Sequence, residues 1–216
     1  MPIKAIQHHV GGGKTNSRTL YKILSYNGYE ELGDKLLYSL CSLGVRSFGS
    51  GMTRDEVKER ALDASMLFVA YNVDKPVGFA GLVEESDGSF YLSAAVVDPT
   101  ERRNGLYTKF TRLRIETVVS SGKNFETRTQ NPVVEKTIRN VLEDMITEEK
   151  IQGYSINREY KPAVYGRLLT DTVPKSGDKN LDKVYSALDY NKGDAFLVKF
   201  SLSLPVHTKY NGGCLW

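Results

Sequence analysis

The strongest constraint on the fold is a long run in which apolar residues occupy every second position. The alternation holds over residues 67–73, 77–83 and 90–96, and the two breaks contain Asp74-Lys75-Pro76 and Asp87-Gly88. A period of two is typical of strands with one buried face, and Asp, Pro and Gly are typical of turns. The pattern therefore predicts a meander of three antiparallel strands.

Two helices are expected before this meander. Leucines recur at helical spacing over residues 29–43, which predicts an amphipathic helix that ends at Gly44. Thr53 followed by Glu56 forms the capping-box pattern, which predicts a second helix that begins there and reaches about Ala64.

A further helix, strand and helix are expected after the meander. An apolar stripe at helical spacing begins at Leu106 and ends before Gly122, and residues 125–129 are compatible with a short strand. Asn131-Pro132 then combines an N-cap residue with a proline at the first helical position, which predicts a helix beginning there.

The C-terminal part is expected to add two strands, over residues 183–190 and 195–204, separated by the turn cluster Asn191-Lys192-Gly193-Asp194. Residues 151–180 are longer than an ordinary connection, so we expect an insertion that holds a short helix and lies near the functional site. The element order predicts an α+β fold with a mixed, mostly antiparallel central sheet flanked by helices. A chain of 216 residues suits a single domain over 1–216.

Composition excludes several classes of protein. Hydrophobic residues make up 40% and charged residues 25% of the chain, which is typical of a globular protein and not of a disordered one. The apolar runs are too short for a membrane-spanning helix, and the N-terminus lacks the apolar core of an export signal, so we expect a cytoplasmic protein without a membrane partner. The net charge of +3 does not by itself require a nucleic-acid partner.

The glycine-rich N-terminus carries weak signals only. Gly11-Gly12-Gly13-Lys14-Thr15 resembles a phosphate-binding loop, but His8 stands where that pattern needs its first glycine. We therefore expect residues 1–15 to form a flexible arm or a turn. His8-His9 has no third ligand at motif spacing, and the two cysteines lie near opposite ends of the chain, so no metal site is predicted.

The most specific signal lies between the third strand of the meander and the next helix. A strand ends at Val97, Pro99 turns the chain, and a basic, glycine-containing loop leads directly into the helix at Leu106. The free N–H groups and the positive dipole end of such a helix start form an anion site. The alternative for this segment is an ordinary surface loop.

The charge of this segment supports the same interpretation. The stretch from residue 102 to residue 114 contains no acidic residue, so its local field favours a polyanion more than the whole chain does. Its basic members are Arg102, Arg103, Lys109, Arg112 and Arg114.

This loop resembles the acyl-CoA loop of the GCN5-related N-acetyltransferase (GNAT) family. The family pattern is Val-x-Pro followed by Arg or Gln, two residues, Gly, one residue, and Gly or Ala; here Val97, Pro99, Arg102 and Gly105 match it. The departure is Tyr107, a bulky residue where the family has a small one. The resemblance extends over about residues 67–145.

The resemblance implies a GNAT-like fold and acetyl-CoA as the acyl donor. It implies that the cofactor-binding residues are Val97, Arg102, Arg103, Asn104, Gly105, Leu106, Tyr107, Thr108 and, at the start of the following helix, Asn131. In this arrangement Tyr107 either points aside, reshapes the site or weakens binding.

The resemblance also implies that an acceptor amine attacks the thioester directly. Such a reaction needs a carbonyl-polarising donor, a base for the amine and an acid for the leaving thiolate. The N–H of Val97 is the expected donor, Glu84 or its neighbour Glu85 the expected base, and Tyr165 the expected acid. The alternatives are that Glu84 is a solvated carboxylate next to a turn and that Tyr165, like Tyr154 and Tyr160, is a packing or surface residue.

The sequence thus predicts an acyl-CoA-dependent N-acetyltransferase with an unidentified amine acceptor, which is a small molecule, a protein or a nucleobase. Two alternatives stay open: a nucleobase- or nucleic-acid-modifying enzyme of the same fold, and a catalytically silent CoA-binding module. A nucleic-acid partner and a homodimer are compatible with the sequence but not required by it.

Overall fold

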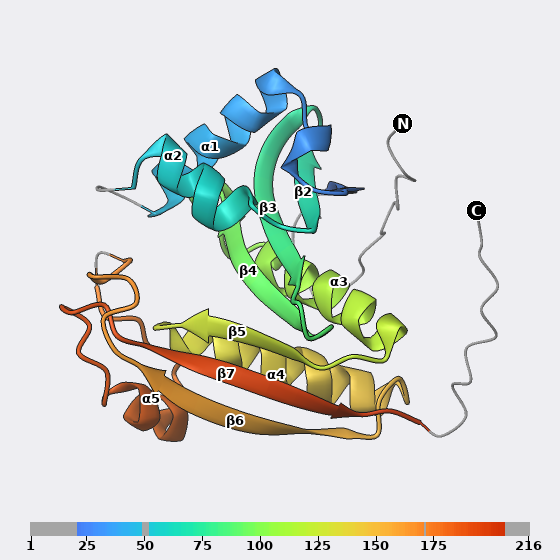
Figure 1. Cartoon of the computed structure of the whole chain (residues 1–216), viewed down its shortest axis with the longest axis vertical. Helices are drawn as coiled ribbons and strands as arrows, with labels where there is room; N and C mark the ends of the chain where they lie inside the picture. The colour runs from blue at the N-terminus through green and yellow to red at the C-terminus, as the bar shows by residue number, and fades with distance from the viewer. Residues whose placement is uncertain (1–20, 49–51, 171, 206–216) are drawn as a thin grey trace.

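The computed structural model describes residues 21–48, 52–170 and 172–205. The N-terminal segment 1–15, expected as a flexible arm, lies outside the described residues. Seven strands form one sheet in the order β1-β2-β3-β4-β5-β7-β6 (Figure 1). Their bounds are β1 Lys22–Tyr26, β2 Met66–Asn72, β3 Lys75–Glu84, β4 Phe90–Val97, β5 Phe125–Thr129, β6 Gly153–Lys161 and β7 Ala195–Ser203.

The predicted meander is confirmed, because β2, β3 and β4 pair antiparallel in sequence order. β4 and β5 are parallel neighbours, as the crossover through a helix requires, but they pair only at Phe90↔Phe125 and Tyr91↔Glu126. Beyond these two pairs the strands diverge, toward the left in Figure 1. The sheet therefore consists of two halves, β1 to β4 and β5-β7-β6, joined at one end.

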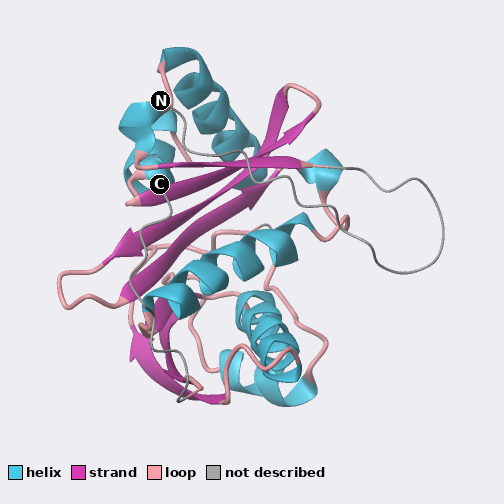
Figure 2. Cartoon of the chain, turned by 90° about the vertical axis from the view of Figure 1, so that its right-hand side faces the viewer, coloured by secondary structure: helices cyan, strands magenta, loops and turns pink. Residues whose placement is uncertain are grey.

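Helices cover both faces of the sheet (Figure 2). α1 packs on β3 and β4 together with α2, whereas α3 packs on the opposite face of the same strands and also contacts α4. The bounds are α1 Asp34–Phe48, α2 Arg54–Val57, α3 Leu106–Ser121, α4 Pro132–Thr147 and α5 Lys179–Tyr185. No helix in the part of the chain that the structure describes is long and apolar enough to cross a membrane.

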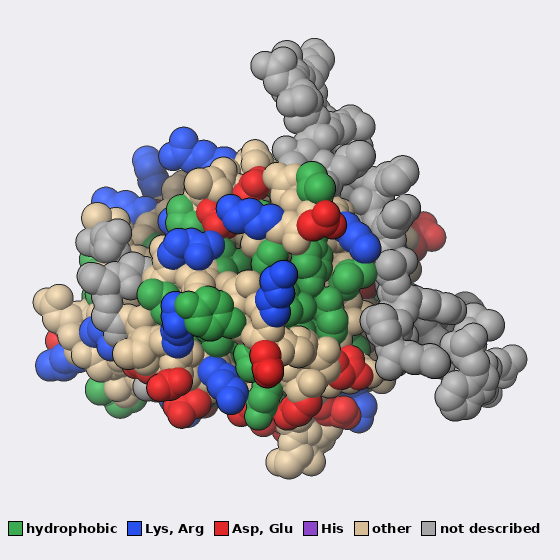
Figure 3. Space-filling view, turned by 90° about the horizontal axis from the view of Figure 1, so that it is seen from above, with side chains coloured by type: hydrophobic (Ala, Val, Ile, Leu, Met, Phe, Trp, Pro, Cys, Tyr) green, Lys and Arg blue, Asp and Glu red, His purple; other side chains and the backbone are tan. Residues whose placement is uncertain are grey.

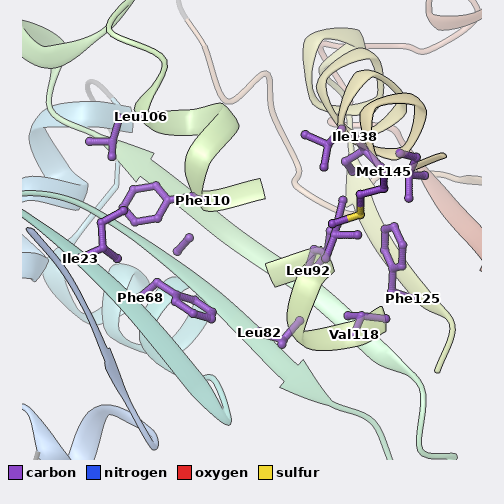
Figure 4. Packing of buried hydrophobic residues seen from close by; sticks show 14 of the residues in the cluster. Ile23, Phe68, Leu82, Leu92, Leu106, Phe110, Val118, Phe125, Ile138 and Met145 are labelled. Carbon is purple, nitrogen blue, oxygen red and sulfur yellow. The ribbon is translucent and has the colours of Figure 1, made fainter. Parts of the chain in front are cut away.

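The larger apolar core lies under α3 and α4 and spans both halves of the sheet. It joins Ile23 and Phe68 on one side to Phe125 and Met145 on the other (Figure 4). Phe125 of β5 also stacks on Phe200 of β7, with ring centroids 4.8 Å apart. This core holds the two halves together although their strands share so few pairs.

The end of the first helix was predicted wrongly. α1 continues through Gly44 to Phe48, and Gly44 is buried against α2. A Cβ on Gly44 would lie 2.5 Å from a methyl carbon of Val57, so this glycine permits close helix packing and does not end the helix. The second helix does begin as predicted, since Thr53 and Glu56 form both hydrogen bonds of the capping box.

The C-terminal part shows two further corrections. The strand predicted over residues 183–190 is wrong, because α5 occupies Lys179–Tyr185 and is capped by Asp178, whose carboxylate accepts from the N–H groups of Asn180 and Leu181. Strand β6 occupies much of the segment 151–180, and the only helix that the structure describes there is the beginning of α5, at the end of the segment. The strand expected over residues 195–204 is confirmed as β7.

Candidate functional site

The splayed ends of β4 and β5 form the most distinctive feature of the sheet. Both strands run in the same direction, so the turn after Val97 and the turn after Thr129 lie on either side of the opening. Each turn leads directly into a helix on the same face, α3 and α4. Two helix N-termini therefore flank the open end of the sheet, where helix dipoles favour negative charge.

The backbone of β4 offers N–H groups to this opening. The N–H of Asp98 donates to the carbonyl of Val77 in β3 at 2.8 Å. Successive N–H groups of a strand point to opposite edges, so the N–H of Val97 points away from β3, toward β5. By the same alternation the N–H of Ala95 faces the opening, since Ala95 and Val97 both lie in the regular part of the β3–β4 ladder.

Within the described ranges, no side chain caps the N-terminus of α3. Gly105 occupies the N-cap position in the left-handed conformation, φ 73°, and makes no side-chain cap bond, whereas α2, α4 and α5 each have one. The first intrahelical bond at this end joins the N–H of Lys109 to the carbonyl of Gly105. A Cβ on Gly105 would meet nothing within 4 Å among the described residues, so the N-cap position itself is open beside these free N–H groups.

Asp98 fixes the start of the loop. Its carboxylate, which is buried, accepts hydrogen bonds from the N–H and hydroxyl of Thr100 and from Arg46 of α1. Burial alone would raise the pKa of Asp98, but these donors outweigh it and hold the pKa below its usual value. The turn after β4 is thereby tied to the last turns of α1.

A second polar cluster holds the middle of the loop. Glu101 accepts from the Tyr21 hydroxyl at 2.7 Å and from the Asn72 amide at 3.0 Å, and the Asn104 amide donates to the same Tyr21 oxygen at 3.2 Å. The Asn104 side chain is therefore part of the loop's own scaffold. Lys109 places its ammonium 5.1 Å from the centre of the Tyr21 ring, beside the helix start.

The basic stretch does not form the polyanion surface that its composition indicates. Arg112 pairs with Glu116 and also with Glu148, which comes from beyond α4, and Arg114 is buried. Arg102 donates to the carbonyl of Ser47 at 2.8 Å, while Arg103 and Thr108 are exposed. Seen from above, Lys and Arg side chains are dispersed among hydrophobic and acidic ones (Figure 3).

Tyr107 does not close the loop. Its side chain lies along α3 and its hydroxyl interacts with the guanidinium of Arg114, two turns further on. Burial raises the pKa of Tyr107, so the hydroxyl stays protonated. The bulky residue is thus directed along the helix, and the N–H groups at the helix start stay open. Leu106 beside it is fully buried in the core.

The structure brings Asn131 and Tyr165 to the β5 side of the opening. Asn131 caps α4, accepting from the N–H of Val133 at 2.9 Å. The Tyr165 hydroxyl donates to the carbonyl of Arg128 in β5 at 2.9 Å. The other two candidate tyrosines are engaged on β6, Tyr154 with Glu143 and Tyr160 with Asp194.

Glu84 is not brought together with these residues. It is the last residue of β3 and pairs with Phe90, at the end where β4 and β5 are joined. The length of β4 separates it from the α3 loop, roughly 20 Å at about 3.3 Å per residue. Its role as a base stays a prediction that this geometry does not support. None of the described residues is a histidine, since His8, His9 and the remaining one, His207, lie outside the described ranges.

Charged groups lie on the face opposite α3 and α4, and among them Arg128 was not identified from the sequence. Arg128 of β5 lies 6.0 Å from the centre of the Tyr91 ring of β4 and so spans the beginning of the opening. Arg167 approaches Glu56 at the start of α2, with a nitrogen–oxygen distance of 3.8 Å. No group of three or more His, Cys, Asp or Glu side chains that could hold a metal occurs in the described ranges.

Comparison with known proteins identifies the fold. No protein-family model and no curated protein sequence matches the chain. Among solved structures it is similar to the ribosomal-protein-S18-alanine N-acetyltransferase from Escherichia coli, with 14% identity, 88% of this chain and 99% of that chain covered, and a TM-score of 0.52. A second similar structure, Ard1 from Thermoplasma volcanium, has 12% identity, covers 85% of this chain and 99% of that chain, and has a TM-score of 0.49.

The first of these similarities shows a shared fold. The chain has the mixed, mostly antiparallel sheet and flanking helices of GNAT acetyltransferases, as the resemblance of the loop implies.

Proposed function

We propose that this protein transfers an acetyl group from acetyl-CoA to the amine of an acceptor. The observation that carries the proposal is the uncapped N-terminus of α3 at the splayed end of the sheet, with Gly105 in the left-handed conformation and open space before it. The GNAT fold supports the same function by analogy, since an N-acetyltransferase shares it.

Acetyl-CoA carries a pyrophosphate, and the α3 loop fits such a group. The N–H groups of residues 106–108 and the helix dipole are directed at one open volume, which is the arrangement that binds phosphate elsewhere. Arg103 and Lys109 add positive charge at the rim, and Asp98 and Glu101 keep the loop in shape through their own hydrogen bonds. A preformed loop lowers the ordering cost of binding.

The opening between β4 and β5 suits the acetyl end of the same molecule. The N–H groups of Ala95 and Val97 face it and can donate to a thioester carbonyl, which would polarise that carbonyl for attack by the amine. We propose Tyr165 as the acid that protonates the leaving thiolate, because its hydroxyl lies beside β5 at this opening.

The proposal is tested by calorimetric titration of the full chain with acetyl-CoA. Gly105→Glu places a carboxylate before the free N–H groups, and we expect it to weaken binding at least tenfold. Gly105→Ala is the matched control, since it imposes the same strain at φ 73° without a charge. Binding to wild type that the alanine variant retains and the glutamate variant loses supports the site; absence of binding to wild type contradicts it.

The acceptor is then sought by following thiol release with a panel of amines. Tyr165→Phe is expected to lower kcat about a hundredfold with little change in acetyl-CoA affinity. Tyr160→Phe, which removes a hydroxyl bound to Asp194 on β6, is the comparison variant and should turn over normally. Equal turnover of Tyr165→Phe and wild type would exclude Tyr165 as the acid.

A further inference from the structure

Among the described residues, the buried arginine of α3 has no acidic partner that would explain it. Arg114 is 2% exposed, and the hydrogen bonds of its guanidinium go to backbone carbonyls. Burial lowers its pKa, yet an arginine side chain stays charged in proteins. A buried charge is costly unless its hydrogen bonds are made, so the position of these carbonyls is informative.

Two of these carbonyls lie at an irregularity of the sheet, and the third, that of Phe110, belongs to α3 itself. Arg114 donates from one nitrogen to Ser93 of β4 at 3.0 Å and to Gly81 of β3 at 3.3 Å. Between the pairs Ala80↔Ala95 and Leu82↔Leu92, one residue of β3 lies opposite two of β4, which defines a β-bulge. The Ser93 hydroxyl is buried without a hydrogen-bond partner among the described residues, so Ser93 is held through its carbonyl.

The bulge determines which N–H groups face the opening. Along a regular strand, successive N–H groups point to opposite edges. An extra residue shifts this alternation by one position, so each residue after the bulge points its N–H to the edge opposite to the one it would face without the bulge. The N–H groups of Ala95 and Val97 come directly after the bulge and point toward β5 because of it. A slip of this pairing by one residue would turn both away.

We propose that Arg114, supported by the hydroxyl of Tyr107, is a positioning residue that fixes the β4 bulge and thereby directs the N–H groups of Ala95 and Val97 at the thioester carbonyl of acetyl-CoA. This inference rests on the proposed function. It also gives a role to Tyr107, the residue that departs from the small one of the GNAT loop pattern: it extends from the loop to Arg114 and links the two parts of the site.

The test compares two ligands that differ at the carbonyl. Acetyl-CoA and S-ethyl-CoA share the nucleotide and the pantetheine arm, but the thioether lacks the carbonyl oxygen. We expect the wild-type affinity for acetyl-CoA, measured by calorimetry, to exceed that for S-ethyl-CoA about fivefold, because one hydrogen bond contributes about that ratio. Arg114→Met should lower this ratio to about one while S-ethyl-CoA affinity changes less than twofold, because the pyrophosphate loop is retained.

Three variants make the result specific. Arg114→Lys can donate to one of the two carbonyls and should restore part of the ratio. Arg112→Met removes an arginine two residues away that pairs with Glu116 and Glu148, and should keep the full ratio. Tyr107→Phe removes only a hydroxyl and should give an intermediate ratio, which keeps the test available if Arg114→Met does not fold.

The outcomes separate this inference from the proposed function. Wild-type preference for acetyl-CoA that persists in the Arg114 and Tyr107 variants overturns the positioning role and leaves the function standing. If wild type binds neither ligand, the proposed function fails. Stabilisation of the bulge by Arg114 is then tested by amide hydrogen exchange of residues 92–97. Faster exchange in Arg114→Lys than in Arg112→Met supports this stabilisation, and equal exchange in the two variants overturns it.

Discussion

At the scale of single residues, the carboxylate of Glu135 brings together polar contacts from three elements outside the site. Glu135 is 0% exposed in α4 and accepts hydrogen bonds from Arg139, from Arg158 of β6 and from the Tyr185 hydroxyl of α5. A buried charge is tolerated only where such partners surround it. These contacts connect α4 to the outer strand and to the last helix.

Glu135→Gln is expected to lower the free energy of unfolding by about 3 kcal/mol, because it leaves the charge of Arg158 without its counter-ion in a half-buried position. Urea unfolding at neutral pH measures the loss. Glu143→Gln is the matched control, since Glu143 is exposed on the same helix and accepts from the Tyr154 hydroxyl. A loss of the same size in the control would contradict this prediction.

The same carboxylate gives a pH dependence. Burial by itself would raise the pKa of Glu135, but Arg158 and Arg139 outweigh burial and lower it. A lowered folded-state pKa means that the stabilisation is complete above the unfolded-state pKa, about 4.3, and is lost as the pH falls through the folded-state value. The stability difference between wild type and Glu135→Gln should therefore shrink with acidification below about pH 4. Unfolding series at several pH values measure it, and a constant difference would exclude this linkage.

At the scale of elements, the contact between α1 and α2 depends on one missing side chain. Gly44 lies inside α1, where alanine would ordinarily favour the helix by about 1 kcal/mol. Here the methyl group would lie 2.5 Å and 2.8 Å from the two Val57 methyl carbons. We expect Gly44→Ala to destabilise the protein by about 1 to 3 kcal/mol despite the better propensity.

A double-mutant cycle with Val57→Ala tests this origin. In that background the two closest contacts, to the Val57 methyl carbons, are removed and only the Cβ of residue 57 remains at 3.2 Å, so the added methyl group should cost less. Thermal or urea unfolding of the four proteins gives the interaction energy. Strict additivity would show that the cost of Gly44→Ala arises elsewhere than at Val57.

The elements that sequence reasoning identified are those set by local pattern. The meander, the capping box of α2 and the start of α4 at Asn131-Pro132 depend on residues close in sequence. β6 was missed because Arg158 occupies one of its inward positions, where an ordinary strand has an apolar residue. The partner of Arg158, Glu135, is distant in the chain and could not be identified from the local sequence. The end of α1 was predicted wrongly for a similar reason: the need for glycine at position 44 arises from packing against Val57, which lies in another helix.

The candidate site divides in the same way. The segment from Val97 to Thr108 is contiguous and could be identified by motif spacing. The bulge of β4 and the burial of Arg114 could not, because both depend on the register between β3 and β4. A weak signal was available: Phe110, Arg114 and Val118 follow one helical face, where a charge between two apolar residues marks a buried polar contact.

At the scale of the whole molecule, the two halves of the sheet meet at only two residue pairs and at the core under α3 and α4. The uncapped start of α3 belongs to the first half, and the start of α4 to the second. A ligand that binds between them adds a connection that the strands do not make. The proposed function therefore predicts that acetyl-CoA stabilises both halves together.

Ligand binding to the folded state alone should raise the free energy of unfolding by about 2.7 kcal/mol at a ligand concentration of 100 Kd. For a chain of this size that corresponds to about 5 to 10 °C in Tm. Hydrogen exchange should localise the protection to residues 95–109 on one side and 129–134 on the other, with β6 changing little because it lies two strands from the opening. Gly105→Glu should abolish the shift, and Gly105→Ala should retain most of it. Protection of the α3 loop without the start of α4 would mean that the ligand occupies the loop alone, and the splayed strands would then need another explanation.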